Sequence, residues 1–403
     1  MGFYEDYVYE LPKYDLPRDG AMANPVAIFK GTDSLPGSTV QMGFGVVTKE
    51  MTEGFPHFHH SKEEYYMFSG QDICQFFDFD AEIEMWMGED PDEMEKFTIT
   101  KPMLVRIPAG MWHGPIRYKR VGKPVAFSSS YLDGEMGRIT RVIKEDDSVE
   151  YPFYSTHLNK CRLNPSVECT WCGKCVEKFL DDPEAAPDPA LAKAFKWAQE
   201  LVETGGAPHT GKYDEYFYEY PVEYHSFGDM YANPRGKFKG ITQMPGARFF
   251  GGFSVALKPN PMEVPHIHHA NDEYLWFIGS NLADVFDYDG EVELMMGWDP
   301  DKMEKLVLTK PCVVRVPAGM WHCPILFKRT DKPIAFFPMY PDGDWSKIIR
   351  RKRPDGTDEY LFEAASLRKC VYDDSKYCVY CAKCYHDKNL KKRGGQFTYK
   401  RKK

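Results

Sequence analysis

Short stretches of alternating hydrophobic and polar residues dominate the chain. Residues 69–88 read SGQDICQFFDFDAEIEMWMG, where acidic and apolar positions take turns. A period of two is typical of a β-strand with one solvated face. FTITKPMLVRIPAG at 97–110 and LVLTKPCVVRVPAG at 306–319 predict further strands interrupted by proline. Many short strands between Gly and Pro favour an all-β barrel or sandwich.

The whole pattern is written twice, at a constant offset of 209 residues. YEDYVYELP at 4–12 corresponds to YDEYFYEYP at 213–221, and the correspondence extends to Cys161 and Cys370. Repeats this long indicate duplication of a whole domain, whereas a solenoid repeats a short unit many times. We therefore expect an N-terminal domain at 1–180, a linker at 181–212 and a C-terminal domain at 213–403.

The linker predicts one helix. Asp188 and Pro189 form a typical helix start, and Gly205 and Gly206 a typical end. The expected connector helix covers roughly 189–203.

A row of alternating acids occurs in each copy. A cation site is one interpretation, but a solvated sheet face is favoured, since alternation alone produces such a row. The acids are Asp78, Asp80, Glu82 and Glu84, and then Asp287, Asp289, Glu291 and Glu293.

Histidine and glutamate recur at one spacing in both halves, in PHFHHSKEEY at 56–65 and PHIHHANDEY at 265–274. On a strand, His57 and His59 point to the same face, and Glu64 follows after a short turn. The later segment PAGMWH adds His113. Imidazole with carboxylate suits Mn, Fe, Ni, Cu or Zn. The sequence thus predicts two sites for a divalent first-row metal: His57, His59, Glu64 and His113, and His266, His268, Glu273 and His322.

These motifs resemble those of the cupin superfamily. The first cupin motif consists of HxH, four further residues, a Glu and a later Gly. In this chain it ends at Gly70 in the first copy and at Gly279 in the second. The second resembles PxGxxH, here Pro108 to His113 and Pro317 to His322. The sequence departs from the second motif at its usual first glycine, replaced by Pro102 and Pro311, and at its usual asparagine, replaced by Arg117 and Leu326.

The resemblance covers both halves and implies a bicupin: two tandem double-stranded β-helix (jelly-roll) barrels, each with a metal inside, most often Mn or Fe. The superfamily includes oxalate decarboxylases, ring-cleaving dioxygenases, ureidoglycine aminohydrolases, sugar isomerases and seed-storage proteins, so its fold does not define a function. Complete ligand sets in both halves argue against a storage protein.

Four cysteines recur with the spacing C-x7-C-x2-C-x2-C, in loops 161–175 and 370–384. Four thiolates can close a tetrahedral structural zinc site. The C-x2-C-x2-C run also resembles a [4Fe–4S] arrangement, and free thiols are a third interpretation. Zinc is the preferred prediction. The expected ligands are Cys161, Cys169, Cys172 and Cys175, and Cys370, Cys378, Cys381 and Cys384.

Two further pairs are candidate catalytic residues. Arg106 and Arg315 lie in otherwise apolar strands, where a cation could hold a substrate carboxylate or enolate, or pair with the acidic row. Tyr65 and Tyr274 follow the ligand glutamates, where a phenol could act as an acid, orient a substrate or pack in the core.

Composition narrows the function classes. The net charge of −9 argues against a nucleic-acid binder, and the basic run at 390–403 is interpreted as a solvated tail. The N-terminus has no secretory signal pattern, and no apolar stretch is long enough to span a membrane. We expect a cytoplasmic protein that acts on a small molecule, with a homo-oligomer left open.

Three functions compete at this point. The first is a non-oxidative metal-dependent hydrolase, decarboxylase or lyase for a small oxygen-rich carboxylate, a cyclic diketone or a polyphenol-derived compound. There a divalent metal would polarise a carbonyl or activate water. The second is an Fe(II) ring-cleaving dioxygenase. The third is a non-catalytic metal- or ligand-binding bicupin.

Overall fold

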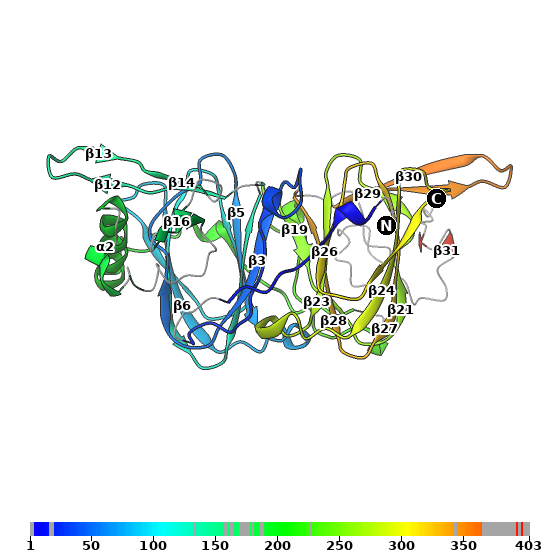
Figure 1. Ribbon diagram of the computed structural model, residues 1–403, viewed down its shortest axis with the longest axis horizontal. Coiled ribbons are helices and arrows are strands. Elements are labelled where there is room, and N and C mark those ends of the chain that lie inside the picture. The colour runs from blue at the N-terminus through cyan, green and yellow to red at the C-terminus, as the bar shows by residue number, and fades with distance from the viewer. Residues whose placement is uncertain are drawn as a thin grey trace.

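The protein consists of two similar β domains side by side (Figure 1). The computed structural model describes residues 4–15, 20–132, 134, 136–155, 160–161, 164–168, 178, 181–185, 189–225, 228–341, 343, 345–364, 392–393 and 396–397. The predicted fold, two tandem cupin-type barrels joined in the sequence by a helical linker, is confirmed.

Two antiparallel sheets face each other in the N-terminal domain. The inner sheet, next to the other domain, has the strand order β17-β8-β5-β10-β3-β2, and the outer sheet the order β4-β9-β6-β7. The inner strands are β2 (Ala27–Phe29), β3 (Gln41–Val47), β5 (Glu64–Gly70), β8 (Met103–Ile107), β10 (Val125–Tyr131) and β17 (Phe217–Glu219). The outer strands are β4 (Met51–Glu53), β6 (Ala81–Gly88), β7 (Glu95–Ile99) and β9 (Trp112–Val121).

The C-terminal domain repeats this arrangement. Its inner sheet contains β1 (Val8–Glu10), β18 (Lys237–Phe238), β19 (Phe250–Gly252), β20 (Ser254–Ala256), β23 (Glu273–Gly279), β26 (Cys312–Val316) and β28 (Ile334–Tyr340). Its outer sheet contains β21 (Asn260–Met262), β22 (His266–Ile267), β24 (Gly290–Gly297), β25 (Glu304–Leu308), β27 (Trp321–Thr330), β29 (Ser346–Lys352) and β30 (Asp358–Ala364).

Shorter elements complete the described chain. They include the pairs β11 (Gly137–Ile139) with β14 (Phe153–Ser155), β12 (Val142–Ile143) with β13 (Val149–Glu150), β15 (Lys160–Cys161) with β16 (Asn164–Glu168), and β31 (Lys392–Arg393) with β32 (Gln396–Phe397). The 3-10 turns are η1 (Glu5–Tyr7), η2 (Gly31–Asp33), η3 (Ile73–Gln75), η4 (Pro183–Ala185), η5 (Asp214–Tyr216), η6 (Gly228–Met230), η7 (Gly240–Thr242) and η8 (Leu282–Asp284).

The two domains exchange an edge strand. β1, near the start of the chain, crosses over to pair with β26 of the C-terminal domain (Figure 1). β17, which follows the linker, pairs in the same way with β8 of the N-terminal domain. Each domain therefore supplies the last strand of the other domain's inner sheet, which protects a sheet edge that would otherwise be open.

Alternation along the inner strands divides their side chains between two cores. On β5, Tyr65 and Met67 point into a core shared with the other domain, while Tyr66 and Phe68 point into the barrel. The shared core is aromatic: the Phe44 ring lies 5.1 Å from Trp276 at an angle of 85°, an edge-to-face contact across the domain boundary. The interface between the domains is thus a continuous hydrophobic core.

The acidic rows lie on the outer faces of β6 and β24 and of the turns before them, as the solvated-face interpretation predicts. Glu84 is the exception: its side chain is buried and pairs with Lys96, Arg117 and Lys119. Asp80 pairs with Arg120 of β9 at 2.6 Å, and Glu82 with Lys119 at 2.7 Å. The second copy repeats this, for example between Glu291 and Lys328 at 2.7 Å. Exposed pairs of this kind contribute little to stability, because water and salt screen them.

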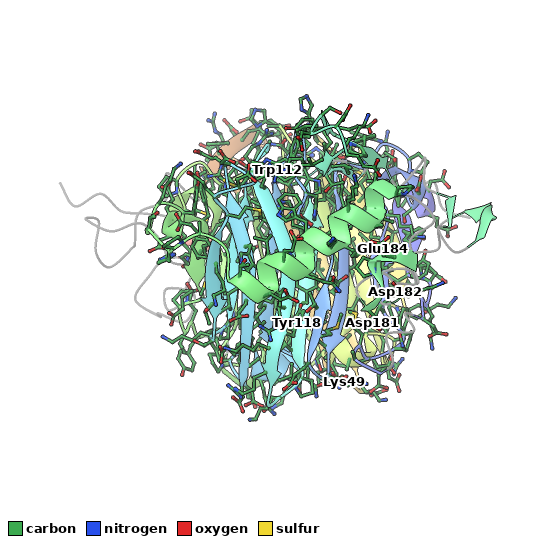
Figure 2. All side chains as sticks on the ribbon, turned by 90° about the vertical axis from the view of Figure 1, so that its left-hand side faces the viewer. Lys49, Trp112, Tyr118, Asp181, Asp182 and Glu184 are labelled. Atoms are coloured by element: carbon green, nitrogen blue, oxygen red, sulfur yellow. The ribbon has the colours of Figure 1, made fainter. Side chains whose placement is uncertain are left out.

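The connector helix forms as predicted. α2 spans Pro189–Thr204 and lies across the outer face of the N-terminal domain (Figure 2). Its buried side chains Leu191, Ala194 and Phe195 pack on Phe55, two residues before His57. Within the described residues, no helix is long and apolar enough to cross a membrane.

Candidate metal centres

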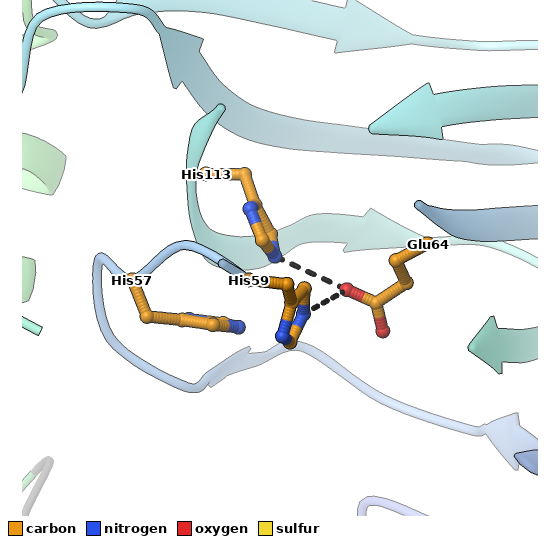
Figure 3. Close-up of side chains that lie close together, drawn as sticks. All are labelled: His57, His59, Glu64 and His113. Atoms are coloured by element: carbon orange, nitrogen blue, oxygen red, sulfur yellow. Dashed lines mark hydrogen bonds and ion pairs between the residues drawn. The ribbon is translucent and has the colours of Figure 1, made fainter. Parts of the chain in front are cut away.

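In the N-terminal domain, four potential ligands converge inside the barrel. His57 and His59 lie in the segment between β4 and β5, Glu64 is the first residue of β5, and His113 is the second residue of β9. One ligand atom from each lies within 4.8 Å of the others, and all four side chains are buried. Figure 3 shows the three rings and the carboxylate arranged around one space.

The imidazoles are oriented by backbone carbonyls. The Nδ1 atoms of His57, His59 and His113 lie 2.7, 2.5 and 3.0 Å from the carbonyl oxygens of Phe55, Gly137 and Met111. Because a carbonyl only accepts, each Nδ1 carries a proton, so Nε2 is the atom that each ring can offer to a metal. This is the second-layer support that metal-binding histidines usually have.

The Glu64 carboxylate faces two of these nitrogens. Its Oε2 lies 2.9 Å from His59 Nε2 and 3.1 Å from His113 Nε2, while Oε1 accepts a hydrogen bond from Ser129 at 2.5 Å. Burial alone would raise the pKa of the Glu64 carboxyl, but the two imidazoles hold it well below its usual value. The carboxylate is therefore negative and available as a ligand.

The donor set fits a divalent metal. Burial, with the nearby His113 and Arg138, lowers the pKa of His57 well below its usual value, so this ring is neutral. Its buried Nε2 has no hydrogen-bond partner among the described residues, and such an orphaned acceptor is costly unless something binds it. Three imidazoles and one carboxylate suit a divalent first-row metal and would leave positions open for other ligands.

The second centre repeats the first. His266, His268, Glu273 and His322 are buried, with their ligand atoms within 4.8 Å of one another. Glu273 Oε2 lies 3.2 Å from His268 Nε2 and 2.9 Å from His322 Nε2. The Nδ1 atoms again face backbone carbonyls, those of Val264, Ser346 and Met320. The eight histidine and glutamate positions predicted from the sequence thus form two separate metal sites.

Buried tyrosines lie beside both centres. Beside the N-terminal centre, the Tyr131 ring lies 4.5 Å from the His59 ring, tilted by 55°. Burial together with Glu64 raises the pKa of Tyr66 well above its usual value. Beside the C-terminal centre, the Tyr340 ring lies 4.8 Å from His268, and burial together with Glu273 raises the pKa of the Tyr340 phenol well above its usual value. Both centres therefore have a protonated phenol close to the ligand glutamate.

Lys347 and Cys323 lie near the C-terminal centre and were not predicted as site residues. The Lys347 ammonium pairs with Glu263 at 2.6 Å, and the buried Cys323 follows His322 with a φ of 70°. A side chain at such a φ is strained, and the equivalent residue in the other domain is Gly114. The repeat could have pointed to Lys347, because another basic residue, Arg138, occupies the equivalent position 209 residues earlier.

Tyr65 and Arg106 do not reach the metal centre. They pair across β5 and β8 on the face opposite Glu64. Tyr65 donates to Glu63 at 2.5 Å and accepts from the Arg248 amide at 2.7 Å, while Arg106 pairs with Glu63 and donates to Pro245 of the other domain. The structure places both in the interface between the domains.

Tyr274 and Arg315 occupy the matching places. Tyr274 accepts from the Thr39 amide at 2.7 Å, and Arg315 pairs with Asp272 at 2.7 Å and donates to the Pro36 carbonyl. All four residues predicted as catalytic thus link the domains, and within the described structure their contacts are with protein groups away from the ligand clusters.

The cysteine motifs lie almost wholly outside the described residues. For Cys161, at the end of β15, only the backbone is described. The remaining members fall outside the described residues: Cys169, Cys172, Cys175, Cys370, Cys378, Cys381 and Cys384. Zinc or iron–sulfur binding at these motifs stays a prediction.

No protein-family model matches this sequence. No curated protein matches it either. Among solved structures, the chain is similar to oxalate decarboxylase of Bacillus subtilis. A structure concerned with its Mn(II) centres is 11% identical, covers 84% of this chain and 78% of its own, and has a TM-score of 0.47. An oxalate decarboxylase structure concerned with the substrate binding mode is 12% identical, covers 84% of this chain and 76% of its own, and has a TM-score of 0.46. Another, at pH 4.6, is 13% identical over 80% and 72%, with a TM-score of 0.43. Likeness this distant says nothing about the substrate of this chain.

Proposed function

We propose that the chain is a metal-dependent bicupin enzyme of non-oxidative type, a hydrolase, decarboxylase or lyase. Its substrate would be a small oxygen-rich carboxylate, a cyclic diketone or a polyphenol-derived compound. The observation that carries this proposal is the pair of buried three-histidine, one-glutamate clusters, each oriented by backbone carbonyls. A bound divalent ion, Mn or Fe in this proposal, would supply the Lewis acidity that polarises a carbonyl or activates water.

The chain's own groups supply the remaining functions. The three Nδ1–H bonds to backbone carbonyls hold the ligand rings, so that substrate binding need not reorganise them. The Tyr66 and Tyr340 phenols lie near Glu64 and Glu273, where a protonated hydroxyl can donate to an oxygen that gains charge. Buried proton donors of this kind suit acid–base chemistry, which supports the non-oxidative class over the dioxygenase.

Metal binding is tested first. We expect His59→Ala to remove the metal of the N-terminal centre and His268→Ala that of the C-terminal centre, so that each variant loses about half of the barrel metal and the double variant loses nearly all of it. Elemental analysis of protein purified without oxygen gives the readout. His60→Ala and His269→Ala are matched controls, because these exposed neighbours lie outside both clusters. Full barrel metal in the double variant would refute the assignment of the ligands.

The reaction class is tested with the metal-loaded protein under argon. Small carboxylic acids and cyclic 1,3-diketones are incubated with it, and products are identified by mass. Gain of water or loss of carbon dioxide, absent in the double variant, supports the proposal. Turnover that requires oxygen and adds both its atoms to the product would establish the dioxygenase instead. A fully metal-loaded protein that is inert toward both panels, with and without oxygen, favours the non-catalytic bicupin.

A further inference from the structure

The guanidinium of Arg138 points toward the N-terminal metal centre. β11 joins the ligand segment through Ile139 and Phe58, whose backbone amides bond to each other's carbonyls at 3.0 and 2.9 Å. Phe58 packs 4.8 Å from Trp112 in the cluster beneath α2, so Ile139 beside it also points outward. Arg138, one position earlier on the strand, therefore points the opposite way, to the side of the ligand His57.

The charge of Arg138 acts on groups of this centre. Burial lowers the pKa of His57, and the Arg138 charge adds to this effect. Burial raises the pKa of Tyr66, and the Arg138 charge opposes the rise. Arg138 also directly follows Gly137, whose carbonyl orients His59. The guanidinium is thus within electrostatic reach of one metal ligand and of the phenol beside another.

Arg138 makes no hydrogen bond or ion pair with its side chain among the described residues. The side chain is partly exposed, while its Nε is buried and unpartnered. A buried N–H without a partner is rare in folded proteins, which points to a group that binds there. Three carboxylates enter the test below: Glu53, which acts on the same Tyr66 phenol, and Asp133 and Glu135, which lie close in sequence but outside the described residues.

The equivalent cation of the C-terminal centre already has a carboxylate partner. Lys347, 209 residues after Arg138, pairs with Glu263 at 2.6 Å, and only 1% of its side chain is exposed. The residue equivalent to Glu263 in the N-terminal domain is Gly54, and both have a left-handed backbone, with φ of 61° and 75°. The N-terminal copy therefore keeps the cation but has no side chain at the position of its partner.

We propose that Arg138 binds the anionic group of a substrate at the N-terminal centre, either a small carboxylate or the enolate of a diketone. A guanidinium presents paired N–H donors that match carboxylate oxygens. A divalent metal held by three imidazoles and one carboxylate keeps a net positive charge, which attracts an anion to the same place. The C-terminal centre, where Lys347 is paired, binds the same anion more weakly. This inference deepens the proposed function and rests on it for turnover, whereas anion binding requires no reaction.

The test replaces the native metal with cobalt(II), whose visible absorption changes when its ligands change. In the full-length His268→Ala variant only the N-terminal centre is expected to hold the ion, and in His59→Ala only the C-terminal centre. Acetate is titrated into each protein, with neutral acetamide as the matched ligand. We expect acetate to bind the N-terminal centre about 10-fold or more tightly than the C-terminal centre, and acetamide to bind both weakly.

Substitution of Arg138 decides the matter. In the His268→Ala background, Arg138→Met should weaken acetate binding by about 10-fold or more, because one charge-assisted contact is lost. Arg138→Lys should keep part of the affinity, since it keeps the charge but not the paired donors. Cobalt content is measured on every variant. Loss of the ion from Arg138→Met would make this residue a support of the metal site and overturn the proposal.

Matched variants locate the effect. Lys347→Met combined with Glu263→Gln, made in the His59→Ala background, removes the paired cation without leaving a lone buried charge, and it should change acetate binding little. Neutral substitutions of the three carboxylates should change acetate binding at the N-terminal centre less than Arg138→Met does. These variants are Glu53→Gln, Asp133→Asn and Glu135→Gln. A gain of about 10-fold in any of them would show that its carboxylate already occupies Arg138, and would overturn the proposal.

The proposal also fails if the two centres bind acetate equally, if acetamide binds as well as acetate, or if Arg138→Met leaves acetate affinity unchanged. Failure of the proposed function has a different signature. A protein that binds acetate through Arg138 but turns over no substrate would refute the enzyme and leave the anion site standing. A protein that turns over an anionic substrate with the same KM in Arg138→Met would do the reverse.

Discussion

At the scale of single residues, the orientation of the metal ligands depends on groups that the sequence does not reveal. His57, His59 and Glu64 are recognisable because their residue types and spacing recur, but the carbonyls that orient the rings belong to Phe55 and Gly137, where any residue type provides one. For Tyr65, the pattern along the strand shows the direction of the side chain. It follows Glu64 on β5, so the alternation that points the glutamate inward points the tyrosine toward the other domain.

His225 gives a prediction at this scale. It is buried, its ring stacks 5.0 Å from Tyr231, and Arg235 Nη1 lies 3.0 Å from its nitrogens. Burial, Arg235 and Lys237 lower its pKa far below the ordinary 6.5. Below about pH 6.5 the unfolded chain therefore binds a proton at this residue that the folded chain excludes, and stability falls by up to ~1.4 kcal/mol per pH unit as the pH drops.

We expect His225→Gln to lessen this acid sensitivity. The measurement is the free energy of unfolding in urea at about pH 7 and about pH 5, on metal-loaded wild-type and variant proteins. The other histidines contribute equally to the wild-type and the variant protein. The difference between the two proteins in how the free energy of unfolding changes with pH therefore isolates His225. Identical slopes would mean that His225 is protonated in the folded protein as readily as in the unfolded one.

At the scale of elements, the repeat predicts strands and the connector helix but not the partners of every strand. The segment YVYELP falls within the predicted N-terminal domain, because nothing in its local sequence distinguishes the edge of one barrel from that of the other. In the structure, β1 pairs with β26, and the Leu11 amide donates to the Pro311 carbonyl at 3.0 Å. The choice is made by long-range geometry, which hydrophobic periodicity does not encode.

Removing this strand should destabilise the domain it joins. A chain shortened to begin at Pro12 loses the β1–β26 pairing and the buried Leu11 side chain. We expect a lower melting temperature, measured by thermal unfolding, and self-association through the open edge of β26, measured by size-exclusion chromatography. An added peptide of residues 4–11 should reverse both effects. An unchanged melting temperature and a monodisperse shortened chain would show that β1 contributes little.

At the scale of the molecule, the two barrels share one core. Trp276 is fully buried and meets Phe44 and Phe29 of the other domain. Sequence analysis predicts two domains but not this fusion, because the apolar residues that line the interface have the same alternation as those that line a barrel. The repeat also does not show where the two copies differ in environment. From the sequence, Lys237 in a short strand would be taken for a solvated residue, but the fold places it inside the barrel.

The shared core predicts cooperative unfolding. We expect Trp276→Ala to cost about 3–5 kcal/mol, as large aromatic truncations in a packed core do, and both domains to melt in one transition. Calorimetry gives both quantities. Trp298→Ala, at a site that is 47% exposed, is the matched control and should change stability little. Two separate transitions, with only one shifted in Trp276→Ala, would show that the barrels are energetically independent.

The strand exchange also determines when each barrel can finish folding while the chain is being synthesised. β1 is made first, yet its partner β26 emerges from the ribosome about three hundred residues later. The N-terminal barrel likewise stays open at β8 until residues 217–219 emerge, after its own domain and the linker have been made. Neither half can finish folding before the other has begun, and the half-made chain carries two unpaired strand edges, a state prone to aggregation. The reciprocal edge strands that protect the mature protein thus leave its nascent form exposed for most of translation.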